Sequence, residues 1–187
     1  MEFPGNISVI LLAGGRSSRM GSDKRLKYIE TKPLIVHSIS LADALSDDVI
    51  ISSNDYLDYF GSHRVVFDNE KWGGPLAALD SCLEKTKNET ILILTCDMPF
   101  LSKSLLAYMI EHHREGSLGC FIKNDDPYPF PMIISGKLTS KIKEQVATGK
   151  RSMKSIIENL PFNPIDFPAW ASINTMKNIN SPEDLSE

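Results

Sequence analysis

The amino-acid sequence predicts an α/β fold in which helices cover both faces of a mostly parallel central sheet. Short apolar runs rich in branched side chains stand at residues 9–12, 49–51, 65–67 and 91–94. Runs of this length and composition are typical of strands buried on both faces. Segments with helical spacing separate the runs, and this alternation indicates crossover helices and three layers. Polar or glycine residues follow the runs, and ligands bind beyond the carboxyl ends of such strands.

The first half of the chain supplies these runs and the helices between them. Gly14–Gly15 follows the first run, and a helix is expected from Pro33 to about residue 45, because proline suits a first helical turn. Residues 56–60 suggest one or two further helical turns. The glycines before Pro75 form a turn, and a second helix is expected to begin at that proline and to end near residue 83.

The second half of the chain predicts a change of strand direction. Ser102 is a plausible N-cap for a helix that ends near residue 113. Residues 118–122 and 132–134 read as two antiparallel strands joined by a polar, proline-rich connection. The rest is expected to contain a helix at residues 136–147, a helix ending near residue 160, an irregular stretch at residues 161–170 and a last helix capped by Ser181. Because no repeat or linker interrupts the sequence, residues 1–187 are expected to form a single domain.

Composition favours a soluble globular protein and argues against several other classes. The net charge of −4 argues against broad nucleic-acid binding, and no apolar run approaches the roughly 20 residues of a membrane span. The N-terminus lacks the charged and apolar regions of a secretion signal. The cysteines Cys82, Cys96 and Cys120 form no CxxC pair, which argues against structural zinc. We therefore expect reduced, buried thiols and a cytoplasmic location.

The clearest chemical signal is the stretch from residue 10 to residue 24, which reads ILLAGGRSSRMGSDK. Gly14–Gly15 can adopt φ > 0 and let backbone N–H groups approach an anion. Small hydroxyl donors follow, then Arg19 and Lys24, a combination suited to wrapping a polyphosphate. The stretch is neither a P-loop nor GxGxxG. The alternative is an ordinary strand-to-helix turn with surface cations.

Two aspartates follow predicted strands at the same edge of the sheet. Asp97 comes after the run at residues 91–94 and can hold a hard cation such as Mg²⁺ through oxygen, or else cap the next helix. Asp68 follows the run at residues 65–67 and can bind nucleoside or metal, or merely cap a turn. Arg19 and Lys24 would neutralise the negative charge of a bound polyphosphate.

Seven short motifs occur in an order that resembles one enzyme family. They are LAGGRSSRMGSDK, KPLIVH, VVFD, GGPLAAL, TCDMPFL, ATGKR and NINSPEDL. The first and fifth resemble signatures of nucleotidyltransferases that release pyrophosphate, and all seven resemble the molybdenum cofactor guanylyltransferase family over nearly the whole chain. The resemblance implies a three-layer Rossmann-like nucleotidyltransferase fold with a mostly parallel central sheet. It implies transfer of GMP from GTP to molybdopterin or its molybdenum form, with Mg²⁺ as cofactor and with contacts to other molybdenum cofactor biosynthesis proteins. As the composition already indicated, no nucleic-acid or membrane partner is expected.

The loop chemistry and the resemblance together predict roles for individual residues. Those expected at the nucleotide are Leu12, Ala13, Gly14, Gly15, Lys24, Ser52, Asp68, Gly74 and Asp97. Arg19, Lys24 and Asp97 are expected to carry catalysis, with Asp97 as the metal ligand. At the acceptor end, the candidates are Lys150, Arg151, Asn178 and Asn180. The alternative for Arg19 and Lys24 is a solvated basic patch, and Arg151 can likewise simply face water. For the two asparagines the alternative is a capping role.

Two departures from the family pattern bear on specificity. Where the family often has an asparagine after the second strand, this chain has Ser52, with Asn54 two residues later. Phe130 replaces a polar residue before Pro131. The first departure bears on base choice and the second on the acceptor. A related enzyme that uses CTP or a sugar phosphate, and a non-catalytic nucleotide-binding protein, therefore stay open as alternatives.

Overall fold

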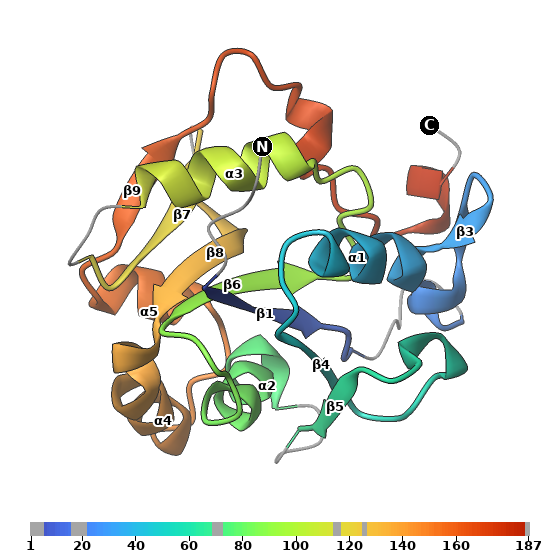
Figure 1. The fold of residues 1–187 in the computed structure, drawn as a ribbon. Helices are drawn as coiled ribbons and strands as arrows, with labels where there is room; N and C mark the ends of the chain where they lie inside the picture. The colour runs from blue at the N-terminus through green and yellow to red at the C-terminus, as the bar shows by residue number, and fades with distance from the viewer. Residues whose placement is uncertain (1–5, 16–21, 69–72, 114–116, 125–126, 186–187) are drawn as a thin grey trace.

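A computed structural model shows the three-layer arrangement (Figure 1) and describes residues 6–15, 22–68, 73–113, 117–124 and 127–185. Seven strands of the described chain form one sheet in the order β5-β4-β1-β6-β8-β7-β9. In that order they are β5 (Arg64–Phe67), β4 (Val49–Ser53), β1 (Ile7–Leu12), β6 (Thr90–Thr95), β8 (Pro127–Ser135), β7 (Gly119–Lys123) and β9 (Asn163–Asp166). The predicted fold class is confirmed.

The parallel half of the sheet brings the predicted site segments to one edge. β1 pairs in parallel with β4 on one side and with β6 on the other, and β4 pairs in parallel with β5. The register places Leu12 level with both Ser52 and Thr95. Since parallel strands end at the same edge, the glycine loop after β1, Asp68 after β5 and Asp97 after β6 meet there.

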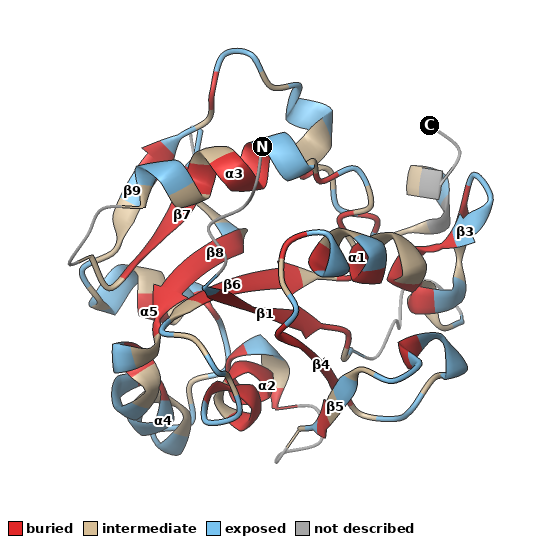
Figure 2. Ribbon diagram, viewed as in Figure 1, coloured by how far each residue is buried: buried red, intermediate tan, exposed pale blue. Residues whose placement is uncertain are grey.

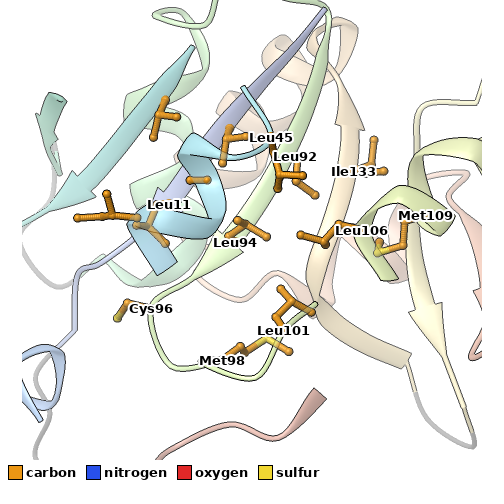
Figure 3. Close-up of a cluster of buried hydrophobic side chains, with 14 of the residues drawn as sticks. Leu11, Leu45, Leu92, Leu94, Cys96, Met98, Leu101, Leu106, Met109 and Ile133 are labelled. Carbon is orange, nitrogen blue, oxygen red and sulfur yellow. The ribbon is translucent and has the colours of Figure 1, made fainter. Parts of the chain in front are cut away.

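The sheet separates two apolar layers, because successive strand residues point to opposite faces. The helices are α1 (Leu34–Asp43), α2 (Gly74–Leu83), α3 (Lys103–His112), α4 (Thr139–Ala147) and α5 (Lys154–Asn159). Leu11 of β1 packs in the layer formed with α1 and α3, whereas Ile10 packs in the layer formed with α2, α4 and α5. Figure 2 shows the buried strands between these helices, and Figure 3 shows the first layer around Leu92 and Leu106. Each fully buried side chain of this size contributes about 1.5–3 kcal/mol.

The antiparallel excursion is confirmed, and the edge beyond it corrects one prediction. β8 pairs antiparallel with β6 and with β7. The expectation that residues 161–170 are irregular was wrong for residues 163–166, because β9 pairs in parallel with β7 and places Pro164 level with Phe121. β9 has one neighbour, and the missing N–H of a proline is tolerated on an edge strand. Within the described ranges, every helix is too short or too polar to cross a lipid bilayer.

Several element ends differ from the prediction by a few residues. A small hairpin of β2 (Tyr28–Ile29) and β3 (Lys32–Pro33) precedes α1, so Pro33 stands at the N-cap rather than in the first turn. β4 extends through Ser53, whose side chain is buried, whereas the strand was expected to end at residue 51. α2 begins at Gly74, one residue before Pro75. The predicted cap of α3 is confirmed, since the Ser102 hydroxyl accepts the N–H of the third helical residue at 3.2 Å.

Short 3₁₀ turns complete the connections. They are η1 (Lys24–Leu26), η2 (Asp58–Phe60), η3 (Gly136–Leu138), η4 (Ile173–Met176) and η5 (Pro182–Leu185). The last one replaces the final helix expected after Ser181. Its entry is held by the Asp184 carboxylate, which accepts the N–H groups of Asn180 and Ser181, each at 2.8 Å. The cap therefore comes from Asp184, and the Ser181 hydroxyl donates to the same carboxylate at 3.1 Å.

A buried carboxylate connects the amino ends of the parallel strands, on the side of the sheet opposite to the predicted site. Asp48 precedes β4 and is 1% exposed. It accepts hydrogen bonds from the Ser8 hydroxyl, from the Arg64 guanidinium and, at 2.8 Å, from the Lys87 N–H. These contacts join β1, β4, β5 and the connection before β6 at the amino ends of the strands. The network stabilises the sheet at the edge away from the predicted site.

Candidate active site

A cavity of about 500 Å³ lies at the carboxyl ends of the parallel strands. Its wall is formed by Leu12, Gly14, Gly15, Lys24, Asn54, Asp68, Gly74, Pro75, Ala78, Thr95, Cys96 and Asp97. The volume falls in the range of roughly 300–1,000 Å³ that is usual for small-molecule sites. The structure therefore brings most of the predicted nucleotide-binding residues to a single cavity.

The glycine pair forms the wall where β1 ends. A Cβ at Gly14 would lie 3.2 Å from Asn54 Nδ2 and 3.3 Å from Asp68 Oδ2, so the lack of a side chain leaves room for both polar groups. Gly15 has a φ of +141°, a conformation that favours glycine. Ala13, which was also predicted at the nucleotide, is fully buried, and its N–H donates to the carbonyl of Ser52 at 2.8 Å. Its side chain thus packs in the core behind the cavity wall.

Asp97 and Lys24 meet at the cavity although they are 73 residues apart in the chain. Lys24 Nζ lies 2.9 Å from Asp97 Oδ2, and the Thr95 hydroxyl donates to Oδ1 at 2.6 Å. Cys96 and Met98, on either side of Asp97, are buried in the apolar layer of α1 and α3 (Figure 3). This anchoring leaves the Asp97 side chain on the cavity side. The carboxylate is therefore fixed in direction and has a cation beside it.

Asp68 forms a second polar group of the cavity with two residues from the carboxyl end of the neighbouring strand β4, namely Ser52 within the strand and Asn54 directly after it. The Ser52 hydroxyl is buried and donates to Asp68 Oδ1 at 2.6 Å, and the Asn54 side chain also hydrogen-bonds to Asp68. Burial raises the pKa of Asp68, and the hydrogen bonds from Ser52 and Asn54 oppose that shift without cancelling it. Ser52, predicted at the nucleotide, thus lies behind Asp68 and orients it, while Asn54 lines the cavity.

Gly74 forms the wall where α2 begins. It has a φ of +82°, and a Cβ there would lie 2.9 Å from the Arg151 carbonyl oxygen, so the close backbone approach requires glycine. The same carbonyl accepts the N–H of Leu76 at 3.2 Å. The exposed Arg151 guanidinium donates to the carbonyls of Val146 at 3.3 Å and Lys150 at 3.2 Å, near the end of α4. Arg151 therefore contacts the start of α2 through its backbone and the end of α4 through its side chain.

The predicted asparagines lie on a segment held beside Asp97. The Ile179 N–H donates to the Asp97 carbonyl at 2.8 Å, and the Ile179 side chain is buried against Leu34 of α1. Asn178 and Asn180, on either side, are exposed. The structure thus places Asn178 and Asn180 near Asp97 at one end of the cavity, and Lys150–Arg151 behind Gly74 at another wall.

The thiol groups in the described part of the chain are expected to be unreactive. Cys82, Cys96 and Cys120 are free and buried, as expected from the sequence. Burial raises the pKa of each thiol to about 12, so the nucleophilic thiolate is scarce at neutral pH. Although Cys96 lines the cavity, a thiol-based reaction is not what this site supports.

Comparison with protein families shows which family the chain belongs to. A model of the MobA-like NTP transferase domain family matches residues 9–164, a range that includes the glycine loop, Asp68, Gly74 and Asp97. The chain belongs to this family.

Relatives in the family match the chain over nearly its whole length. A molybdenum cofactor guanylyltransferase of Pseudomonas fluorescens (strain SBW25) is 35% identical, and the match covers 96% of this chain and 95% of that protein. One from Aliivibrio fischeri (strain MJ11) is 26% identical, covering 100% of this chain and 97% of that protein. The crystal structure of molybdopterin-guanine dinucleotide biosynthesis protein A from Archaeoglobus fulgidus superposes with a TM-score of 0.83 at 20% identity, covering 96% of this chain and 95% of that one. This last likeness shows the shared fold.

The cavity includes residues that were not predicted from the sequence, and one predicted residue lies outside the described ranges. Arg19, predicted to be catalytic, lies outside the described residues. Asn54, Thr95, Pro75 and Ala78 line the cavity but were not among the predicted site residues. Thr95 and Asn54 carry a usable signal, because both are polar residues at or just beyond a strand end. Pro75 and Ala78 depend on which face of α2 turns to the cavity, and this follows from helix packing rather than from local sequence.

Proposed function

We propose that the protein transfers GMP from GTP to molybdopterin, or to its molybdenum form, and releases pyrophosphate. The observation that carries the proposal is the pair of Lys24 and Asp97, 2.9 Å apart in a cavity that the glycine loop also lines. A cation, a carboxylate that can hold Mg²⁺ and a glycine pair in one cavity suit a triphosphate. Family membership and the names of the full-length relatives support the choice of substrates.

The cavity wall suggests how GTP lies. Leu12, Pro75 and Ala78 offer apolar surface for a base, while Asp68 stands among polar groups nearby. Guanine presents two adjacent N–H donors on one edge, which a carboxylate can accept together, whereas cytosine presents one donor beside an acceptor. An ionised Asp68 therefore favours GTP over CTP. The triphosphate then extends toward Gly15 and Lys24.

The reaction requires placement and charge neutralisation rather than a general base. An oxygen of the acceptor phosphate attacks the α-phosphorus, and the bond from that phosphorus to the bridging oxygen breaks, so that pyrophosphate leaves with the electron pair. An acceptor phosphate is already ionised near neutral pH. Lys24 and Arg19 neutralise the charge that develops on the leaving group, and the cavity holds the reactants in line.

Asp97 suits Mg²⁺ as part of this proposal. Among the described residues, no group of three or more His, Cys, Asp or Glu side chains is placed to hold a metal ion. Mg²⁺ does not need such a group, because it keeps several waters and binds through one or two carboxylates together with substrate phosphates. Asp97, about one-fifth exposed and oriented by Thr95, meets that requirement. A bound Mg²⁺ would supply further positive charge at the reacting phosphate.

The acceptor is assigned to the outer ends of the cavity. Asn178 and Asn180 flank the residue whose N–H binds the Asp97 carbonyl, and Arg151 follows α4 beside Gly74. Arg151 can grip phosphate oxygens in a fork that Lys150 cannot offer. We further propose that residues 1–187 act as one domain in the cytoplasm, where other proteins of molybdenum cofactor biosynthesis can be contacted.

Pyrophosphate release is the measurement that tests the function. The protein is given molybdopterin and each of the four nucleoside triphosphates in turn, with Mg²⁺ or with a chelator. The expected result is turnover with GTP that needs both the metal and the acceptor. A preference for CTP would contradict the GTP assignment. Nucleotide binding with no pyrophosphate release under any combination would favour a binding protein over an enzyme.

A further inference from the structure

Arg25 is a charged residue buried behind the cavity, where its guanidinium joins three separate segments. It is 8% exposed. Its Nε lies 2.9 Å from Asp23 Oδ1, and its Nη2 lies 2.5 Å from Asp23 Oδ2. Its Nη1 and Nη2 donate to the two carboxylate oxygens of Asp55 at 2.7 and 3.0 Å. Nη1 also donates to the Ser53 hydroxyl at 2.9 Å and to the Ala13 carbonyl at 3.3 Å.

Each partner of Arg25 is the chain neighbour of a residue that lines the cavity. Asp23 precedes Lys24 and caps η1 through its side chain, which accepts the N–H of Arg25 at 3.0 Å. Ala13 precedes Gly14 at the end of β1, and Ser53 and Asp55 flank Asn54 after β4. One side chain thus ties the Lys24 turn to the ends of two central strands. The cavity wall includes Lys24 but does not include Arg25.

The charge of Arg25 is secured by its surroundings. Burial by itself lowers the pKa of a guanidinium, but the hydrogen bonds to Asp23 and Asp55, and the charges of these carboxylates, raise the pKa of Arg25 above its ordinary value. The guanidinium therefore stays protonated near neutral pH. Two carboxylates at the two edges of a planar fork match arginine geometry, whereas a lysine ammonium cannot bind both in the same way.

We propose that Arg25 is a positioning residue for the triphosphate end of the site, acting through Lys24. Arg25 holds Asp23 and the start of η1 against the ends of β1 and β4. Since Lys24 is the first residue of η1, this contact fixes the position of the Lys24 backbone at the cavity. The Lys24 side chain then reaches Asp97 in the free protein and the phosphates in the complex. This inference rests on the proposed function, because it assumes that the cavity binds a nucleoside triphosphate.

The test compares GTP affinity and stability in matched variants of the full chain. Equilibrium binding of GTP and the melting temperature are measured for the wild type, Arg25→Met, Arg25→Lys and Arg64→Met. Arg64 is the control because it pairs with Asp48 at the opposite edge of the sheet. We expect Arg25→Met to weaken GTP binding about tenfold or more, and Arg25→Lys to restore it only in part. Arg64→Met is expected to lower the melting temperature while leaving GTP affinity unchanged.

A double-variant comparison separates positioning from simple structural support. If Arg25 acts through Lys24, then Arg25→Met added to Lys24→Met changes GTP affinity much less than it does in the wild type. Equal losses in both backgrounds would overturn the proposal, as would wild-type affinity in Arg25→Met with only a lower melting temperature. Should Arg25→Met fail to fold, Asp55→Asn carries the same test, since the Asp55 side chain is 58% exposed and its exchange preserves volume.

The outcomes also distinguish this proposal from the proposed function. Failure of the wild-type protein to bind GTP while it binds another nucleoside triphosphate would refute the GTP assignment. The Arg25 comparison is then read with that nucleotide, and its result still decides the positioning role. Binding of GTP by the wild type and by Arg25→Met with equal affinity would refute the positioning role and leave the proposed function intact.

Discussion

Replacing Asp97 by asparagine separates the chemical role of this residue from its structural one. Asparagine keeps the shape, and its carbonyl oxygen can still accept the Thr95 hydroxyl that lies 2.6 Å from Oδ1 in the wild type. Its amide nitrogen, however, would face the Lys24 ammonium, which lies 2.9 Å from Oδ2. A donor then meets a donor, and the negative charge is lost. The variant should therefore fold but lose the interaction with Lys24 and with a metal ion.

The expected magnitudes of the two effects differ widely. The side chains of Lys24 and Asp97 are 18% and 19% exposed, so solvent partly screens their attraction, and we expect a stability loss of about 1 kcal/mol. For a chain of this size, that corresponds to a fall in melting temperature of about 2–4 °C. Loss of a fixed charge at the reacting phosphate is expected to lower kcat about 10²–10³-fold, or about 2.7–4 kcal/mol.

The assay is pyrophosphate release under saturating GTP and molybdopterin, with thermal denaturation measured on the same samples. Thr95→Val, which removes the hydrogen bond that orients Asp97, is expected to cost about tenfold or less in kcat. Asp166→Asn is the control, since Asp166 is an exposed carboxylate at the end of β9. A kcat for Asp97→Asn within about threefold of the wild type, which is less than 1 kcal/mol, would refute the assigned role.

Other predictions address the remaining walls of the site and the pH response. Gly14→Ala should raise the KM for GTP about tenfold with little change in melting temperature, because the new Cβ would crowd the Asp68 carboxylate at 3.3 Å. Asp68→Asn should weaken GTP binding yet keep or raise the melting temperature at neutral pH, because burial raises the pKa of Asp68 and makes its ionised form destabilising. The difference in melting temperature between this variant and the wild type should disappear as pH falls through that raised pKa. Burial lowers the pKa of His63, but hydrogen bonds to Asp43 and to a backbone carbonyl outweigh that effect and raise the pKa. Protonated His63 should therefore stabilise the fold fully below about pH 6.5, and this stabilisation should be lost as pH rises through the raised pKa. His63→Gln should remove this pH dependence from the melting temperature. Arg151→Ala should raise the KM for molybdopterin about tenfold and leave the KM for GTP unchanged, because the carbonyl that contacts α2 is retained.

Each of these predictions has a clear contrary result. Wild-type GTP kinetics in Gly14→Ala would show that Asp68 can move without cost. A lower melting temperature for Asp68→Asn at neutral pH would mean that the carboxylate stabilises the fold. Unchanged pH dependence in His63→Gln would assign that dependence to other groups. Equal rises of both KM values in Arg151→Ala would place Arg151 in the fold or at the nucleotide instead of at the acceptor.

Local sequence by itself determined the parallel half of the sheet and the kinds of residue at the carboxyl ends of its strands. Continuous runs of branched apolar residues indicate strands that are buried on both faces. The bounds of β1, β4, β5 and β6 were therefore predicted to within a few residues. Gly14 and Asp97, which line the cavity, were predicted at the site because a glycine or a carboxylate directly after a strand can be recognised without knowledge of distant contacts. The strand at residues 163–166 was missed, because an edge position tolerates the proline that hides its pattern.

Only the tertiary structure decided which side chains meet. Lys24 and Asp97 are 73 residues apart, and their contact depends on β1 and β6 being neighbours in the sheet. Ser52 was expected at the nucleotide, and only the structure shows that its hydroxyl donates to Asp68, a residue of the cavity wall. Arg25 gave no signal, because arginine is mostly exposed and its burial is stable only where carboxylates from two segments close around it. The pattern of apolar residues along the chain indicates which segments are buried, whereas these contacts depend on which strands lie next to each other in the sheet.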